Sequence, residues 1–158
     1  MAQVNSVSGR LKSERGAELI EFALIFPLLL LVLLGIIDFG FLFQRYEVLT
    51  NATREGARIA VLPGYSDADV KSRICAYLTS GGVPTTGCPN PAWITVTTEN
   101  LAVPSGPPLS VKRVNVAYGH NFMFIGPIIG LMGGSWTNAK TITTEAIMRT
   151  ELAVTPTP

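Results

Sequence analysis

Hydrophobic positions are concentrated in one N-terminal segment, with polar and charged residues on both sides of it. The chain has 16 residues without a charge from Phe22 to Ile37, and Asp38 is the only charge between Glu21 and Arg45. Extended to Phe43, the segment approaches the ~20 residues that a helix needs to cross a bilayer. Because basic residues precede it, the positive-inside rule places its N-terminal side in the cytoplasm. The pattern predicts one transmembrane helix, with the chain after Arg45 exported.

A cleaved secretory signal explains this segment less well. The apolar core of a signal peptide is ~7–15 residues long and ends at a small-x-small cleavage site. Here the segment is longer and ends in Asp38-Phe39-Gly40-Phe41-Leu42-Phe43, which contains no such site. We therefore expect residues 17–43 to be retained as a transmembrane helix.

The helical pattern continues beyond the membrane segment. Small and apolar residues recur at helical spacing, at Leu49, Ala52, Gly56 and Ile59. Pro63-Gly64 then ends the pattern, because this pair does not continue a helix. The sequence predicts one helix from Ala17 to Leu62, behind a disordered basic leader of residues 1–16. We expect its outer apolar face to line a sheet, with Arg54 and Arg58 facing water or a partner.

The rest of the chain, residues 44–158, predicts a small exported head. Ser66 with Asp69 resembles the capping-box start of a second helix, which ends at Gly81-Gly82. The expected apolar face of this helix contains Val70, Ile74, Tyr77 and Leu78.

Three later segments have the alternation or the β-branched residues of strands, at 93–98, 111–118 and 139–149. One face of the second and third strands carries Val114, Val116, Tyr118, Ile142, Thr144, Ala146 and Met148. The elements together predict a pilin-like α+β fold. In this fold a long N-terminal transmembrane helix continues into a head with a second helix and a three-stranded antiparallel sheet.

The segment Phe122–Met132 is apolar, but its 11 residues are too few to span a membrane. One interpretation is a loop with a short helix that covers the sheet. The other is an exposed apolar patch that touches the bilayer or a partner subunit. The sequence leaves both interpretations open.

Cys75 and Cys88 are the two cysteines of the chain, and both follow the apolar segment. In an oxidising compartment they would form one disulfide. Closing this loop would stabilise the fold by ~3 kcal/mol in the chain-entropy model. The alternative is a pair of free, partly buried thiols. Neither a Cys-x-x-Cys motif nor a Cys/His cluster indicates a metal site.

The sequence has no constellation typical of catalysis or cofactor binding. His120 is the single histidine and lies in a Tyr-Gly-His-Asn turn, where we expect a structural or exposed side chain. A P-loop, a dinucleotide-binding glycine pattern and a nucleophile elbow are all absent from the sequence. The formal net charge of +1 gives no electrostatic footprint for nucleic acid. We therefore expect a protein that is not an enzyme and that uses neither a cofactor nor a metal.

The start of the apolar segment has a more specific pattern. Three basic residues precede the pair Gly16-Ala17, and Glu21 is the fifth residue after the glycine. A carboxylate just inside a membrane helix is unfavourable and usually has a function. A basic leader, a Gly-Ala junction and an acid near the start of a hydrophobic helix form the arrangement of a prepilin.

From Arg15 to Ala60 the chain resembles the TadE-like family, which comprises minor pilins or pseudopilins of the bacterial tight-adherence (Flp) pilus machinery. Three pieces together carry the resemblance: Phe26-Pro27-Leu28-Leu29, Ile37-Asp38-Phe39-Gly40 and Arg54-Glu55-Gly56-Ala57-Arg58. Beyond residue 60 the resemblance is weak and depends mainly on the strand-like C-terminal segment.

The resemblance implies cleavage by a prepilin peptidase between Gly16 and Ala17, and a role for Glu21 in assembly. In pilin-like proteins the matching glutamate neutralises the free amine of a neighbouring subunit, and here that amine would belong to Ala17. The alternative for Glu21 is a carboxylate near the membrane surface that reaches water.

Four further residues are candidates for subunit contacts. Asp38 is either an acid at the outer membrane interface or a contact with another membrane helix. Arg54, Glu55 and Arg58 can pair along the helix surface. These three residues form either a solvated face or, by the resemblance, a contact with a subunit or with the assembly machinery.

We therefore predict a bacterial inner-membrane protein, with a cytoplasmic N-terminus and an exported head, that supports assembly or function of an adhesive pilus. Its expected partners are the lipid bilayer, a prepilin peptidase, other pilin-like subunits and the assembly machinery. The alternative is a single-pass, envelope-anchored binding or adhesion domain that enters no filament. Only a pilin needs both the junction at Gly16 and the acid at Glu21.

Overall fold

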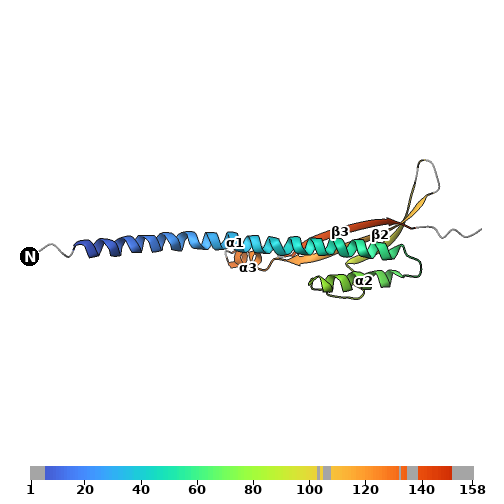
Figure 1. Ribbon diagram of the computed structural model, residues 1–158, viewed down its shortest axis with the longest axis horizontal. Helices are drawn as coiled ribbons and strands as arrows, with labels where there is room; N and C mark the ends of the chain where they lie inside the picture. Colours follow the sequence, from blue (N-terminus) through green and yellow to red (C-terminus); the bar gives the residue numbers. More distant parts are fainter. Residues whose placement is uncertain (1–5, 103, 105–107, 132, 135–138, 151–158) are drawn as a thin grey trace, which may run out of the picture. The chain divides into compact units, whose positions relative to one another are not determined.

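The computed structural model describes residues 6–102, 104, 108–131, 133–134 and 139–150. Its elements are α1 (Ser6–Ala60), α2 (Asp67–Ser80), β1 (Ile94–Leu101), β2 (Leu109–Asn121), α3 (Ile125–Leu131) and β3 (Ala139–Arg149) (Figure 1). They form two compact units: an anchor unit from Met1–Gly40 and Met123–Trp136, and a head unit from Phe41–Phe122 and Thr137–Pro158. The predicted α+β fold class is confirmed.

Helix α1 begins at Ser6, so the expectation of a disordered leader is wrong for residues 6–16. Gly9 and Gly16 are isolated glycines, which weaken a helix by ~1 kcal/mol each without ending it. The helix ends at Ala60, close to the predicted end. Residues 6–16 of the basic leader and the membrane segment are therefore parts of one continuous helix.

Within the anchor unit, α1 presents an apolar surface that the described chain does not cover. Every large apolar side chain from Leu19 to Leu33 is exposed. The region Gly16–Ala60 includes an 18-residue window that is long and apolar enough to cross a membrane, and none of this window is buried. A helix that is apolar on all sides is stable only where lipid or other apolar groups surround it. The helix thus fits a single-pass membrane anchor.

In the head unit, one face of α1 enters the hydrophobic core. The predicted face is confirmed as buried at Leu49, Ala52 and Ile59. Arg54 and Arg58 are exposed, also as predicted. The hydroxyls of buried Thr53 and Thr144 share a hydrogen bond of 2.7 Å, which joins α1 to β3. Since each hydroxyl has a partner, this polar pair is tolerated in the core.

Gly56 contacts α2, whereas we expected it to line the sheet. A Cβ atom at Gly56 would meet Cδ1 and Cγ1 of Ile74 at 2.5 and 2.6 Å. At Gly81 a Cβ atom would meet Cγ1 of Val48 at 2.4 Å. The two glycines therefore allow α1 and α2 to pack closely side by side (Figure 1).

The predicted capping box of α2 is confirmed. The N–H of Asp69 donates to the Ser66 hydroxyl, and the N–H of Ser66 donates to the Asp69 carboxylate. Hydrogen bonds from Ser66 lower the pKa of Asp69, and the bond from the hydroxyl has a larger effect than the bond from the N–H. After the helix, Gly82 has a φ of 71°, which suits glycine. The buried face includes Cys75 in place of Tyr77, which is exposed.

The strands form an antiparallel sheet in the order β1-β2-β3. Val114 of the central strand pairs with Val96 of β1 and with Ala146 of β3. These three side chains contribute to the core or pack against it. The predicted inward face is confirmed as buried at Val114, Val116, Tyr118, Ile142 and Thr144. Strands β1 and β2 extend beyond the predicted ranges, because their pairing continues to Leu101 and Leu109.

The predicted disulfide between Cys75 and Cys88 is confirmed, and the two Cα atoms are 6.0 Å apart. It joins α2 to the loop before β1, and the Cys75 side chain is buried. In the chain-entropy model, such a crosslink stabilises the head by ~3 kcal/mol because it restricts the unfolded chain.

The apolar segment Phe122–Met132 contains the short helix α3, as one interpretation predicted. Its contacts differ from that interpretation, because Met123–Trp136 groups with the anchor unit and not with the sheet. Met123 is 58% exposed, so part of the segment's apolar surface is uncovered by the described chain.

Replacing Gly56 by leucine should destabilise the head. Even the first carbon of the new side chain would overlap Ile74, and overpacking of this kind costs ~1–3 kcal/mol. The measurement is chemical denaturation of the full chain in detergent, followed by tryptophan fluorescence. Gly40→Leu is the control, because a Cβ atom at Gly40 meets nothing within 4 Å. Equal midpoints for the two variants would contradict the close packing of α1 on α2.

Candidate functional site

The predicted processing junction, Gly16-Ala17, lies within α1 where its apolar surface begins. Glu21 lies about one helical turn after Ala17, so the two residues share a face of the helix. Both side chains are exposed. Among the described residues, none provides a hydrogen bond or an ion pair to the Glu21 carboxylate. This carboxylate is therefore available to a group outside the chain.

Asp38 lies toward the other end of the apolar segment and is almost completely buried, at 1% exposure. Its Oδ1 accepts the backbone N–H of Met123 at 2.9 Å. Its Oδ2 accepts those of Phe124 at 2.9 Å and Ile125 at 2.7 Å. These N–H groups form the start of α3, where the helix dipole also favours a negative charge. Asp38 thus acts as a remote cap that holds α3 within the anchor unit.

Sequence reasoning did not find this contact, although one signal for it was present. The residues before α3 are Phe122, Met123 and Phe124, and none has the polar side chain of an N-cap. A helix that starts without a local cap needs an acceptor from elsewhere in the chain. The structure gives Asp38 this role within the chain, and its predicted contact with another subunit remains a prediction.

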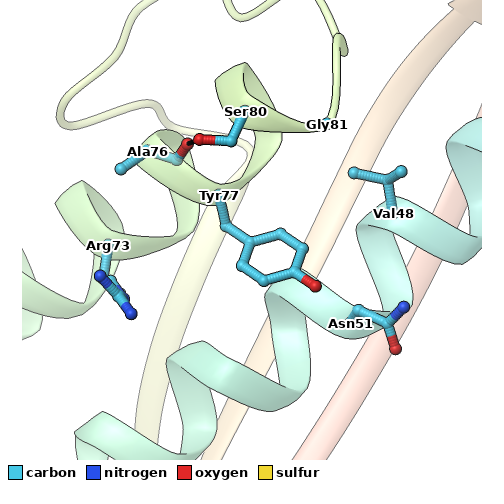
Figure 2. Close-up of a pocket in the computed structure, with 7 residues that line it drawn as sticks. All are labelled: Val48, Asn51, Arg73, Ala76, Tyr77, Ser80 and Gly81. Carbon is cyan, nitrogen blue, oxygen red and sulfur yellow. Dashed lines mark hydrogen bonds between the residues drawn. The ribbon is translucent and has the colours of Figure 1, made fainter.

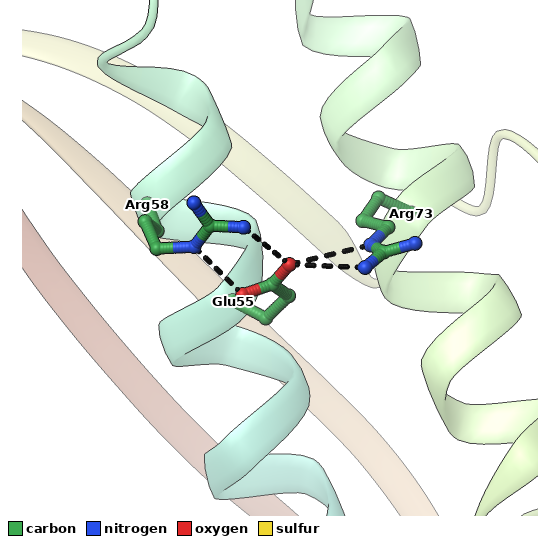
Figure 3. A network of polar contacts seen from close by, with 3 residues as sticks. All are labelled: Glu55, Arg58 and Arg73. Carbon is green, nitrogen blue, oxygen red and sulfur yellow. Dashed lines mark hydrogen bonds and ion pairs between the residues drawn. The ribbon is translucent and has the colours of Figure 1, made fainter.

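A charge cluster lies on the surface of the head unit, where Glu55 of α1 bridges Arg58 of α1 and Arg73 of α2 (Figure 3). Arg58 donates two hydrogen bonds of 2.9 Å to the carboxylate. Arg73 donates at 3.1 and 3.4 Å. These hydrogen bonds lower the pKa of Glu55 to about 2, and the bond from Arg58 has the largest effect. Pairing of Glu55 with Arg58 was predicted, whereas Arg73 was missed because it lies on another helix.

A groove between α1 and α2 adjoins this cluster and has a volume of about 410 Å³. Tyr77 points from α2 toward Asn51 of α1, and Arg73 belongs both to the groove and to the charge cluster (Figure 2). Among the residues that the structure describes, the lining consists of Val48, Asn51, Arg73, Ala76, Tyr77, Ser80 and Gly81. An aromatic ring, an arginine and an amide suit contact with a partner, and this lining has no pair of a nucleophile and a base.

Arg45 and His120 form a second polar contact in the head unit. Nη1 of Arg45 lies 2.9 Å from Nδ1 of His120, which is 1% exposed. Because a guanidinium only donates, Nδ1 of His120 is the acceptor in this contact. The ring also makes an edge contact with Phe122. The expectation of a structural histidine agrees with this geometry, but the expected turn is wrong, because His120 lies in β2 and pairs with Lys140 of β3. Within the described ranges, no three His, Cys, Asp or Glu side chains group as a metal site.

Residues 16–58 match the model of a family described as TadE-like protein. No curated protein and no solved structure matches the chain. The matched segment includes Gly16, Glu21, Asp38 and the run from Arg54 to Arg58. The chain thus carries a TadE-like segment, and the predicted resemblance to this family is confirmed there.

Because of the charge cluster, the unfolding free energy of the head should depend on pH in the acidic range. A carboxylate whose pKa falls from 4.5 to about 2 contributes stability above pH 4.5, and this contribution disappears as the pH falls through 2. Glu55→Gln should therefore lower the unfolding free energy by ~1 kcal/mol at neutral pH, since both arginines are well solvated. Near pH 2 the variant and the parent should be equally stable. Denaturation at both pH values checks this, with Arg54→Gln as the control; a pH-independent difference would contradict the cause given.

Replacing Asp38 by alanine should loosen the start of α3. Three N–H groups would lose their acceptor, and loss of a cap costs ~1 kcal/mol or more. Hydrogen exchange of the full chain in lipid nanodiscs should show faster exchange at Met123, Phe124 and Ile125. Glu47→Ala provides the control, since Glu47 is an exposed acid in the same helix. Unchanged protection at these three amides would show that Asp38 does not cap α3.

Proposed function

We propose that the chain is a minor pilin or pseudopilin that supports assembly or function of an adhesive pilus of the tight-adherence (Flp) type. A prepilin peptidase would first remove residues 1–16. The observation that carries this proposal is the exposed Glu21 carboxylate, which has no partner among the described residues and follows the Gly16-Ala17 junction by one turn. The TadE-like match supports it, since residues 16–58 include both features. The proposed role is structural, without catalysis or a cofactor.

The chemistry of the proposed site depends on cleavage. Cutting after Gly16 would give Ala17 a free α-amine, which is mostly protonated near neutral pH. In an apolar environment an isolated amine or carboxylate is unfavourable, and an opposite charge close by stabilises both. The Glu21 carboxylate of one subunit would thus pair with the Ala17 amine of its neighbour. This pairing would set the register between adjacent α1 helices.

The location of the protein is part of the same proposal. The basic residues before the anchor support a cytoplasmic N-terminus in the bacterial inner membrane. The disulfide supports export of the head, because such bonds persist in oxidising compartments. The surface with Arg54, Glu55 and Arg58 would then contact other pilin-like subunits or the assembly machinery.

Variants of Glu21 test the proposal. Glu21→Ala and Glu21→Gln should both insert normally, since removal of a charge makes insertion of an apolar helix easier. Both should abolish piliation, because the amine of the neighbouring subunit would lose its counter-charge; the glutamine variant keeps the size of the side chain and removes only its charge. The measurement is the amount of sheared pilus in cells in which each variant reaches the parent's abundance.

Glu18→Gln is the matched control, because Glu18 is an exposed acid one turn closer to the leader. It should leave piliation unchanged. Normal piliation with both Glu21 variants would favour the alternative function, an envelope-anchored binding domain outside the filament, in which Glu21 is an acid near the membrane surface.

A further inference from the structure

We propose that α3 is a second lipid-contacting element, held by Asp38 in the outer leaflet of the membrane that α1 crosses. This inference rests on the membrane anchoring of α1. It adds a short helix, from a distant part of the chain, that enters the bilayer surface without crossing it.

The depth of Asp38 follows from the charges along α1. The charge-free segment begins after Glu21, and Asp38 lies about 25 Å farther along the helix at ~1.5 Å per residue. The hydrocarbon core of a bilayer is ~30 Å thick. With Glu21 at the inner boundary, Asp38 lies just inside the outer boundary of the hydrocarbon. A carboxylate at this depth needs hydrogen-bond donors from the protein.

The N-terminus of α3 supplies these donors. The N–H groups of Met123, Phe124 and Ile125 bind the two carboxylate oxygens at 2.7–2.9 Å. These bonds place the start of α3 at the level of Asp38. They also satisfy three backbone donors that would otherwise need water, and Pro127 has no N–H to satisfy.

The C-terminal end of α3 is also satisfied by the chain itself. The N–H of Gly134 donates to the carbonyl of Ile129 at 3.0 Å, and that of Gly133 donates to Gly130 at 3.1 Å. With a φ of 77° at Gly133, this is the pattern of a Schellman motif. Satisfied backbone groups at the helix ends are the main requirement for a short helix in contact with lipid.

The side chains of α3 fit the same environment. Its sequence, Ile-Gly-Pro-Ile-Ile-Gly-Leu, has no polar side chain, and the preceding Met123 is 58% exposed. Seven residues span only ~10 Å as a helix and cannot cross the bilayer. Ile125, Ile128 and Ile129 are half-buried, and α3 groups in the anchor unit with the exposed apolar part of α1. We therefore assign lipid as the partner that covers the apolar surface of α3, as it covers that of α1.

Fluorescence quenching in vesicles tests this assignment. An environment-sensitive fluorescent amino acid replaces Met123 in the full chain, reconstituted in phosphatidylcholine vesicles with a nitroxide near the headgroup end of the acyl chains. The same probe at Ile36 reports the outer part of the membrane segment, and at Ile147 of β3 it reports an exposed apolar position of the head. Lipid quenching at position 123 should be several-fold stronger than at position 147, and aqueous iodide should quench position 123 weakly.

The other outcomes would overturn the inference in distinguishable ways. Strong iodide quenching at position 123 would mean that α3 lies in water. Protection from both quenchers would mean that protein, such as a second copy of the chain, covers α3. If the probe at Ile36 escapes lipid quenching, then the membrane anchor itself is wrong. Asp38→Ala should reduce lipid quenching at position 123, and unchanged quenching would contradict the holding role of Asp38.

Discussion

One constraint determines most of this structure: a single continuous helix must serve two environments. From Phe22 to Leu33, α1 is apolar on every side and exposed, which suits lipid or other apolar helices. In the head, the same helix has a narrow buried face that includes Leu49 and Ala52, with charged residues on its other faces. The change from an all-round apolar surface to a single apolar face separates the part that needs a membrane from the part that needs a protein core.

The acids at the two ends of the apolar segment illustrate how the chain treats charge in apolar surroundings. Asp38 is satisfied within the chain by three N–H groups and is buried. Glu21 is exposed and has no such partner among the described residues. The two carboxylates on this helix thus have different roles. The satisfied acid organises the chain, and the available acid is the one for which we propose a contact between subunits.

Features that depend on neighbouring residues could be predicted from the sequence. The capping box at Ser66, the inward faces of the strands and the apolar face of α1 follow from residue type and spacing. The disulfide was predictable because the chain has only two cysteines and the predicted topology exports both. The sequence also predicted the junction and Glu21 as a candidate site, through a local pattern that the family match covers.

Features that join distant parts of the chain were missed. The hydrogen bonds of Asp38 reach residues 85 or more positions away, and no local pattern encodes such a pairing. Arg73 was overlooked for the same reason, because it meets Glu55 only when α2 packs on α1. The prediction that Gly56 lies on the buried face of α1 was right. The prediction that this glycine contacts the sheet was wrong, because it contacts α2. A helical period identifies the buried face, and only the packed fold identifies what covers it.

Processing of the chain as a pilin is tested most directly by the mass of its N-terminal peptide. The protein is isolated from membranes of cells with an active prepilin peptidase, digested and examined by mass spectrometry. We expect an N-terminal peptide that begins at Ala17 and that is absent when the peptidase is inactivated. A protein that retains Met1–Gly16 in cells with an active peptidase would contradict the proposed function.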